Sequence, residues 1–558
     1  MYFRKISVFG YSILATACLP ACRNESDVTE KKSLDPIIND AMPNIVLILV
    51  DDVGFDKVGY SSGNKLTPNI DQLAADGVIY NNAYTSSAIC TPSRYSLLTG
   101  KFPGRCTDIT FVENSPDNDP YLINWNSFLS KSDYTIFEAL SENGYQTGFV
   151  GKYHLASKSE LDACLPALDS SLIPADADKY LRIHQDSLVS LIKRKTGADF
   201  VDNVHIGNCE ENLAKWLKTH HTEWTTYGAC SFIENAKDDK PFFLYLATNL
   251  THGPGIIEGF ENDPVYTPEG KVEDVMKYSL PKDKVKNQML FKANWKDENK
   301  LAVVLLDNQI GDIINALKRK GCYDQSMIIF VSDNNNEPGK GSCYESGIKV
   351  PMLIKWPQNQ NSGMKDNRLI ENVDIFPTIL QMCLFYYAEG NIDGKSFLEP
   401  ESKRDGLYFE AGYTRALRYG KYKYIAFRYP DFIKQGIKDG LNKLAPNHMG
   451  ADWIKQAWFS AACYPGYWDQ DQLYDLEKDP FELVNLAGKK EYKKVLLEMK
   501  NRIDCYLKTF RNEFSVQNDN FMESNEYKRA VDNSKKEISR AIGPENIRIF
   551  NQRHLMLR

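Results

Sequence analysis

The sequence predicts an α/β fold built on a largely buried sheet that is flanked by helices. Short apolar runs alternate with helical patterns along the chain, as expected when strands and helices alternate. The runs are rich in β-branched and aromatic residues and have no polar face, which is typical of strands covered on both sides. At 558 residues, with 42% hydrophobic and 25% charged residues, the chain is long enough for one large domain and a smaller one.

Four of these runs are predicted strands, and each ends at polar side chains. Residues 44–50 lead into Asp51 and Asp52, residues 145–150 into Lys152 and His154, residues 241–248 into His252, and residues 326–331 into Asp333 and Asn334. Taken singly, such groups are more often turns, caps or loop residues than sites. Ligands of open α/β sheets bind beyond the carboxyl ends of the strands. The shared position therefore predicts one common site.

Cys90 is predicted to lie at the start of a helix. Residues 67–77 have the Pro and Gly signals of a preceding helix, and residues 78–84 are predicted to be extended. Thr91 is then predicted to be the N-cap, and Pro92 the first residue, of a helix that runs through Leu98. At a helix N-terminus the oriented N–H groups favour negative charge. A solitary cysteine is usually a small buried hydrophobe, so the surrounding pattern has to decide its role.

The N-terminus predicts export. Arg4 and Lys5 precede an apolar stretch, residues 6–17, that is too short to span a bilayer. Residues 19–22 resemble the lipobox of bacterial lipoproteins, with Cys22 as the residue to be lipidated. We therefore expect residues 1–22 to be a lipoprotein signal peptide that leaves the protein lipid-anchored to a membrane, at the periplasm or the outer-membrane surface.

Two alternatives to this anchor stay open. Cys18 is a second candidate for acylation, although Ala15 stands where a large apolar residue is usual. Simple cleavage would instead give a periplasmic or secreted protein. In either case residues 23–41, which are polar and lack periodicity, are expected to be a tether.

Charge and cysteine content exclude some classes of function. The formal net charge of -7 argues against a nucleic-acid partner, although a local basic cluster can still bind an anionic substrate. The 12 cysteines show neither CxxC pairs nor zinc-like spacing. Some of them can form disulfides in an oxidising compartment, but the sequence does not give their connectivity.

The segment Cys90-Thr-Pro-Ser-Arg94, followed by Leu-Thr-Gly, resembles the signature of type I, formylglycine-dependent sulfatases of the alkaline phosphatase superfamily. In that family a maturation enzyme recognises Cys-x-Pro-x-Arg and oxidises the cysteine to formylglycine. The other family blocks occur in the expected order over residues 42–510. Five residues depart from the family pattern. Tyr153 stands for Trp, Thr251 for Pro and Asn335 for Gly, and Ser346 and Lys349 lie in the stretch that is usually Gly-Gly-x-Arg.

The resemblance also implies the domain organisation. A large central sheet, mixed but mostly parallel and alkaline phosphatase-like, is expected in a catalytic domain over residues 42–400. Residues 401–512 are expected to be a smaller α+β subdomain with an antiparallel sheet and a helix over residues 490–508. Residues 513–558 are charged and helix-prone, and they form an extension with no assigned role.

The resemblance further implies the site. The expected metal ligands are Asp51, Asp52, Cys90, Asp333 and Asn334, and the expected catalytic residues are Cys90, Arg94, Lys152, His154, His252 and Lys340. Oxygen ligands suit Ca²⁺, which is our choice, or Mg²⁺. The hydrated aldehyde attacks sulfur through one hydroxyl, and loss of a proton from the second hydroxyl then expels sulfate and restores the aldehyde.

The resemblance also implies a role for each catalytic side chain. Arg94 and Lys152 would hold the formylglycine, and His154 would help to deprotonate its second hydroxyl. His252 and Lys340 would bind the sulfate and protonate the leaving alcohol.

Two rival functions and the substrate stay open at this point. A phosphatase or phosphodiesterase of the superfamily would carry Ser or Thr as nucleophile and several zinc-binding histidines, whereas this chain has 8 histidines in all. A silent glycan-binding lipoprotein would result if Cys90 were never oxidised. The expected substrate is a sulfated polysaccharide or its oligosaccharides. Aromatic and charged residues of segments 161–227 and 427–468 either line the leaving-group pocket or form ordinary core, and they include Trp216, His220, His221, Trp453, Trp458, Tyr464 and Trp468.

Overall fold

The computed structural model describes residues 42–115, 118–165, 174–209, 215–292, 296–336, 338–385, 392–398, 406–440, 444, 455–511 and 513–543. The predicted signal peptide and tether, with Cys22, therefore lie outside the described residues. Trp453 and the end of the extension, from residue 544, also lie outside them. Within the described part of the chain, no helix has both the length and the apolar character needed to cross a membrane.

The central sheet has eight strands in the order β11-β2-β10-β9-β1-β6-β4-β5. Their bounds are Ile45–Val50 (β1), Val78–Tyr80 (β2), Gln146–Lys152 (β4), Phe200–His205 (β5), Phe242–Ala247 (β6), Met327–Ser332 (β9), Met352–Lys355 (β10) and Met364–Asp366 (β11). Only β10 runs antiparallel to its neighbours β9 and β2, and the other pairings are parallel. The predicted mixed, mostly parallel sheet and its four predicted strands are confirmed.

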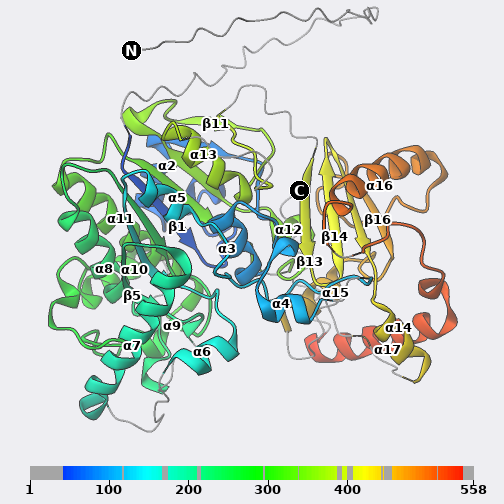
Figure 1. The fold of residues 1–558 in the computed structure, drawn as a ribbon, viewed down its shortest axis with the longest axis horizontal. Helices are drawn as coiled ribbons and strands as arrows, with labels where there is room; N and C mark the ends of the chain where they lie inside the picture. The colour runs from blue at the N-terminus through cyan, green and yellow to red at the C-terminus, as the bar shows by residue number, and fades with distance from the viewer. Residues whose placement is uncertain are drawn as a thin grey trace, which may run out of the picture. The chain divides into compact units, whose positions relative to one another are not determined.

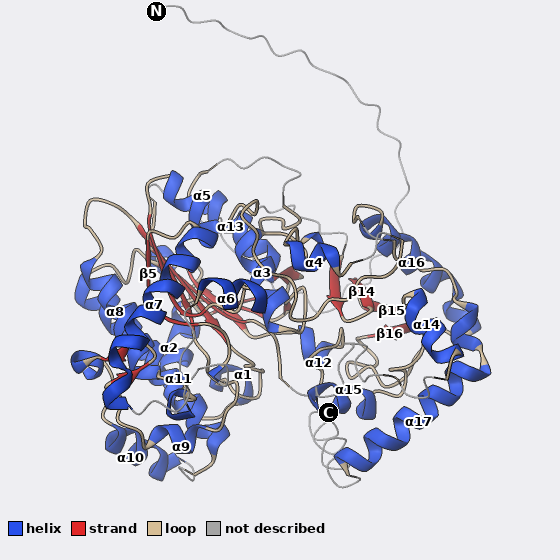
Figure 2. Ribbon diagram, turned by 60° about the horizontal axis from the view of Figure 1, so that its bottom comes forward, coloured by secondary structure: helices blue, strands red, loops and turns tan. Residues whose placement is uncertain are grey.

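Seventeen helices are assigned in the described residues. They are α1 Gly59–Ser62, α2 Pro68–Asp76, α3 Cys90–Thr99, α4 Ile109–Glu113, α5 Ile136–Glu142, α6 Lys158–Cys164, α7 Pro174–Thr196, α8 Thr222–Asn235, α9 Ile256–Phe260, α10 Lys282–Lys292, α11 Glu298–Lys320, α12 Glu345–Ile348, α13 Ile375–Met382, α14 Asp431–Lys438, α15 Lys455–Cys463, α16 Lys493–Leu507 and α17 Asn525–Ile542. Figure 2 shows helices on both sides of the central strands, with α3, α5 and α13 on one side and α2, α8 and α11 on the other.

The two helical layers explain why the central strands are apolar on both faces. Val46, Ile48 and Val50 of β1 lie in one buried cluster with side chains of α2, α8 and α11. On the opposite face, Phe137 of α5 contacts Phe243 of β6 with ring centroids 5.3 Å apart. Every residue of β1 is at most 1% exposed. Such a strand needs no polar residue until its end, where the chain turns at Asp51.

Helix α3 starts two residues earlier than predicted. Cys90 is its first residue and Ile89 its N-cap, so Thr91 lies inside the helix and does not cap it. The helix ends at Gly100, whose φ of 67° is in the left-handed region that glycine adopts readily. Every residue of α3 is buried. Cys90 is therefore fixed between the sheet and the rest of the domain, at a helix N-terminus as predicted.

A second sheet, β13-β14-β15-β16, is antiparallel throughout. Its strands are Leu407–Ala411, Thr414–Tyr419, Tyr422–Phe427 and Asp471–Asp475, and Figure 1 shows them in yellow beside α16. This arrangement confirms the expected smaller antiparallel sheet with a helix. The extension also contributes to the core, because Tyr527, Val531 and Ile538 of α17 are buried in one cluster with Phe409 of β13. Both sheets belong to one compact unit, and the domain boundary near residue 400 stays a prediction.

Glu410 of β13 joins the second sheet to the segment that follows α3. Its carboxylate accepts hydrogen bonds from the Gly104 backbone N–H at 2.7 Å and from the Tyr121 hydroxyl at 2.6 Å. Arg415 lies 3.3 Å from the same carboxylate and donates to the Tyr121 carbonyl at 2.8 Å. Both charged side chains are fully buried. A buried charge pair within the second sheet thus ties that sheet, through its hydrogen bonds to Gly104 and Tyr121, to the segment that follows α3.

Replacing Glu410 with alanine should destabilise the fold severely. The change leaves Arg415 charged and unpaired in the interior, which typically costs about 3–5 kcal/mol. Urea unfolding followed by tryptophan fluorescence measures the loss. Glu410→Gln is the matched control, since it keeps the size and an acceptor and should cost clearly less. An alanine variant as stable as the unchanged protein would contradict a joining role for this pair.

Candidate active site

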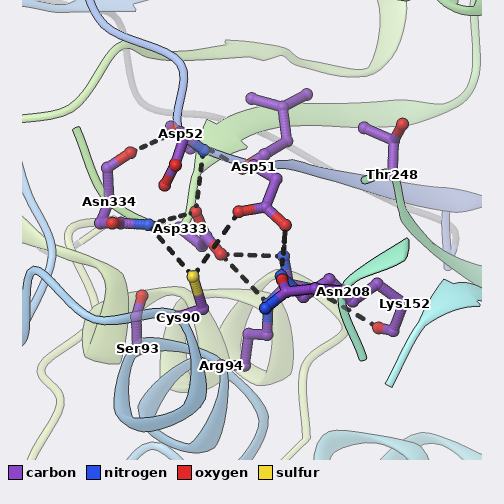
Figure 3. Close-up of polar contacts among 12 residues, drawn as sticks. Asp51, Asp52, Cys90, Ser93, Arg94, Lys152, Asn208, Thr248, Asp333 and Asn334 are labelled. Carbon is purple, nitrogen blue, oxygen red and sulfur yellow. Dashed lines mark hydrogen bonds and ion pairs between the residues drawn. The ribbon is translucent and has the colours of Figure 1, made fainter. Parts of the chain in front are cut away.

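The carboxyl ends of β1, β4 and β9 bring the predicted polar residues to the N-terminus of α3 (Figure 3). Four ligand atoms, one each from Asp51, Asp52, Cys90 and Asp333, lie within 4.8 Å of one another, and all four residues are buried. The Asn334 amide donates to Asp333 Oδ1 at 2.6 Å and lies 3.8 Å from Cys90 Sγ. Cys90 Sγ is 3.6 Å from Asp51 Oδ1. The five expected metal ligands therefore form one cluster.

Three cations balance the three carboxylates of this cluster. Arg94 donates to Asp333 Oδ2 through Nη2 at 2.8 Å and through Nε at 3.1 Å, and its Nη2 lies 3.3 Å from Asp51 Oδ2. Lys152 Nζ lies 2.5 Å from Asp51 Oδ2. Lys340 Nζ lies 2.5 Å from Asp52 Oδ2.

These ion pairs keep the two aspartates ionised. Burial would raise the pKa of Asp51, but Lys152 and Arg94 outweigh that effect and the pKa lies below its ordinary value. Burial would also raise the pKa of Asp52, but the charges of Lys340 and His252, with the hydrogen bond from Lys340, together outweigh it and the pKa is lowered. Both groups can therefore act as anionic oxygen ligands.

Cys90 responds to burial in the opposite way. Burial raises the pKa of its thiol well above the ordinary value, even though Lys152 and Lys340 act to lower it. Because the thiolate is the nucleophilic form, the encoded residue is a poor nucleophile in this environment. Nucleophilic chemistry at this position therefore requires a different functional group at Cys90.

Both expected histidines are near the cluster. His154 follows the end of β4, where Gly151 and His154 take positive φ values of 97° and 56°. Burial, then Lys152 and Arg94, lower the pKa of His154 well below its ordinary value, so its imidazole is neutral. His252 lies in the loop after β6, and its carbonyl oxygen is 2.7 Å from His220 Nε2. The charge of His252 contributes to the lowered pKa values of Asp51 and Asp52.

Two residues of the site were not predicted from the sequence. Asn208 follows β5, and its side-chain oxygen accepts a hydrogen bond from Lys152 Nζ at 2.5 Å. Lys57 donates to the Asp52 carbonyl at 2.7 Å and to Thr251 Oγ1 at 2.5 Å, so it ties the turn after β1 to the loop that carries His252. Neither residue belongs to a recognisable motif. An expected strand over residues 200–205 would have directed attention to Asn208.

The cluster has the chemistry of a divalent cation site. Asp52 Oδ1 and Asn334 Oδ1 are buried, and neither accepts a hydrogen bond from the part of the chain that the structure describes. An oxygen buried without a partner is costly unless a ligand completes it. Together with the ionised carboxylates, these atoms form the hard oxygen set that calcium and magnesium prefer.

Adding Ca²⁺ or Mg²⁺ to metal-free protein should raise its melting temperature. A cation at one hundred times its Kd adds about 2.7 kcal/mol to the free energy of unfolding. Asn334→Ala removes one ligand oxygen and should shrink this gain by about 1.4 kcal/mol for each tenfold loss of affinity. Differential scanning fluorimetry after EDTA treatment checks both effects. Asp56→Asn is the control, because Asp56 is exposed and lies in the turn after β1 without belonging to the cluster. An equal rise in melting temperature for the unchanged protein, Asn334→Ala and Asp56→Asn would contradict a cation site at this cluster.

Comparison with known proteins agrees with this geometry. A family model described as Sulfatase matches residues 43–383, and one described as N-sulphoglucosamine sulphohydrolase, C-terminal, matches residues 339–439. Human arylsulfatase A is 27% identical over 80% of this chain and 83% of its own length. An ulvan-active sulfatase of Formosa agariphila is 23% identical over 83% of this chain and 74% of its own length.

A solved structure extends the comparison to the fold. It is a complex of an enzyme with its substrate D-glucosamine-2-N,6-O-disulfate, and it matches with a TM-score of 0.53. The match covers 84% of this chain and 98% of that one at 19% sequence identity, so the likeness concerns the fold alone. The family model covers more than half of the chain and includes every residue of the metal-ligand cluster. The chain belongs to the sulfatase family and is a sulfuric ester hydrolase.

Proposed function

We propose that this enzyme removes sulfate from a sulfated polysaccharide or its oligosaccharides, with formylglycine made from Cys90 as its nucleophile. The observation that carries the proposal is the position of Cys90. Its side chain lies at the start of α3, within 3.6 Å of Asp51 and 3.8 Å of Asn334. Burial raises the pKa of its thiol, which therefore stays protonated. A residue in this place has to be converted before it can attack a sulfate ester.

The conversion also implies a partner. Oxidation to formylglycine replaces the thiol and one hydrogen of Cys90 by an aldehyde oxygen. Cys90 is 0% exposed, so a maturation enzyme must reach it before this region has folded. We therefore propose a formylglycine-generating enzyme as a transient partner of the unfolded chain.

The side chains around Cys90 support two roles, which are binding of a cation and positioning of the converted residue. We propose that Asp51, Asp52, Asp333, Asn334 and the converted Cys90 hold Ca²⁺, or Mg²⁺ in its place. When bound, the cation supplies positive charge to the sulfate oxygens and to the nucleophilic oxygen. Arg94 and Lys152 both pair with Asp51, which lies beside Cys90. Through this contact they would hold the converted residue in place.

The proposed proton transfers use His154, His252 and Lys340. One hydroxyl of the hydrated aldehyde gives its proton to a neighbouring carboxylate of the cluster and bonds to sulfur, while the bond from sulfur to the leaving alcohol breaks. His252 and Lys340 bind the sulfate and give the alcohol its proton. His154, neutral because burial lowers its pKa, accepts a proton from the second hydroxyl. The bond from carbon to the sulfated oxygen then breaks, sulfate leaves, and water rehydrates the aldehyde.

The metal-ligand cluster favours a sulfatase over a phosphatase or phosphodiesterase. The ligand cluster found among the described residues contains three carboxylates and a cysteine but no histidine. Catalytic zinc sites include histidine ligands, whereas sites built mainly from carboxylate and amide oxygens suit calcium and magnesium. A silent glycan-binding protein is disfavoured too, because no proposed catalytic residue is replaced.

A glycan substrate is supported by the relatives. One relative is named for its action on ulvan, and one similar structure contains a disulfated glucosamine as substrate. The second matching model is named for sulphoglucosamine hydrolysis. We also propose export and lipidation at Cys22, which would place the enzyme at the periplasm or the outer-membrane surface, where such polymers are met.

Cys90→Ala should abolish sulfate release. Alanine cannot be converted to an aldehyde, so turnover of an aryl sulfate should fall by about a thousandfold or more. A sulfate assay checks this, with Cys505→Ala as control, since that thiol is exposed and lies in α16. Phosphate release from the matching aryl phosphate, measured in parallel, separates the rival. Phosphate release that persists in Cys90→Ala, together with no sulfate release by the unchanged enzyme, would contradict the proposal.

A further inference from the structure

A cavity lies next to the loop that carries His252. It has a volume of about 130 Å³ and is lined by residues from the start of α8, from the segment after α9 and from α10. It is smaller than the pockets of roughly 300–1,000 Å³ that hold drug-sized ligands, so it suits a single small ring.

The hydrogen bond between His220 and the His252 carbonyl fixes the cavity beside the active site. Thr219 and His221, on either side of His220, both line the cavity. Asn262 and Asp263, also in its wall, follow His252 through the short helix α9. The charges of Asp51 and Lys152 act on the pKa of His220, which burial lowers to about 4. The two chain segments that form the cavity wall therefore also hold His252.

The lining has the mixture of groups that recognises a sugar. Trp216 and Tyr266 meet edge to face with ring centroids 6.4 Å apart, and both line the cavity. His221 is 7% exposed, and its ring has no side-chain hydrogen-bond partner among the described residues, so that the Thr219 backbone engages at most one of its two nitrogens. Aromatic rings offer an apolar surface to the C–H faces of a sugar, and a buried imidazole with one nitrogen to spare can bond a sugar hydroxyl.

The charges of the lining select against a second anionic group. Glu223 and Asp263 contribute two carboxylates, while Lys282 is the cation of the lining. The Lys282 ammonium already donates to the Asn262 carbonyl. Burial, followed by the charges of His205 and His220, lowers the pKa of His221 well below its ordinary value, so His221 adds no positive charge. The wall is thus net negative, and it would repel a uronate or a second sulfate.

We propose that this cavity binds one uncharged sugar ring, the neighbour of the sugar that carries the sulfate ester. The inference rests on the proposed function, and it adds a specificity rule to it. The active site accepts the sulfated sugar, while Trp216, His221 and Tyr266 select a neutral neighbour. A substrate chain in which charged and uncharged sugars alternate fits both sites at once.

The test compares matched substrates with the fully converted, metal-loaded enzyme. A panel of monosaccharides, each sulfated at one hydroxyl, is assayed beside disaccharides that add unsulfated galactose or glucuronic acid to the same sugar. The ratio of kcat/KM for the galactose disaccharide to that for the monosaccharide should be about ten. In Trp216→Ala this ratio should fall to about one. The ratio is the readout because a loss of folded enzyme lowers both rates equally.

Two further variants separate recognition from packing. Tyr134→Ala removes an aromatic ring that is 46% exposed and does not line the cavity, so it should keep the wild-type ratio. Asp263→Asn removes a negative charge from the wall and should raise kcat/KM for the glucuronic acid disaccharide several-fold relative to the galactose one. Calorimetric titration of Cys90→Ala with the same sugars should show tighter binding of the galactose disaccharide than of the monosaccharide.

The possible results distinguish the two proposals. Sulfate release with a ratio near one, or a ratio that Trp216→Ala leaves unchanged, would overturn the sugar site while the sulfatase function stands. An Asp263→Asn variant with unaltered preference would overturn the charge rule. Release of no sulfate from any sugar of the panel by the unchanged enzyme would overturn the glycan substrate and the neighbouring site together.

Discussion

The burial of three carboxylates beside three cations is the constraint on which the rest of this structure depends. Asp51, Asp52 and Asp333 are nearly inaccessible, and removing each charge from water costs on the order of several kcal/mol unless a partner is close. Arg94, Lys152 and Lys340 supply those partners at 2.5–2.8 Å. The partners come from α3, from the end of β4 and from the loop after β9, so the parallel sheet and the buried helix have to be placed together for the charges to balance.

This balance also explains the chemistry that the site can support. With equal numbers of carboxylates and cations the cluster is close to neutral, and a divalent cation would make it positive enough to hold an anionic ester. The same burial keeps the Cys90 thiol protonated, because the pKa of the thiol is raised. The fold thus favours negative charge on bound oxygen atoms while it suppresses the reactivity of the encoded cysteine. The proposed conversion to formylglycine would resolve this conflict, since a hydrated aldehyde would present oxygen to a bound cation and to sulfur.

Much of the fold and of the site could be predicted because the deciding signals are local. The apolar runs of β1, β4, β6 and β9 and the polar residues after them are adjacent in sequence, and so are Cys90 and Arg94. Strand β5 escaped prediction because Asp202 and Asn203, both disfavoured in strands, interrupt it at a bulge. Asn208 was missed with it. The contact of Lys57 with Thr251 spans 194 residues, and no local pattern encodes such a pair. Residues 513–558 were predicted to be charged and helix-prone, but the packing of α17 was not predicted. Its buried side chains are recognisable only from their contacts with the second sheet.

The most direct test of this account is mass spectrometry of the peptide that carries Cys90, taken from active enzyme produced together with a formylglycine-generating enzyme. The expected residue has lost the elements of hydrogen sulfide and gained one oxygen, and its amount should be proportional to the specific activity of the preparation. A peptide with unmodified cysteine, from a preparation that releases sulfate at full rate, would contradict this account.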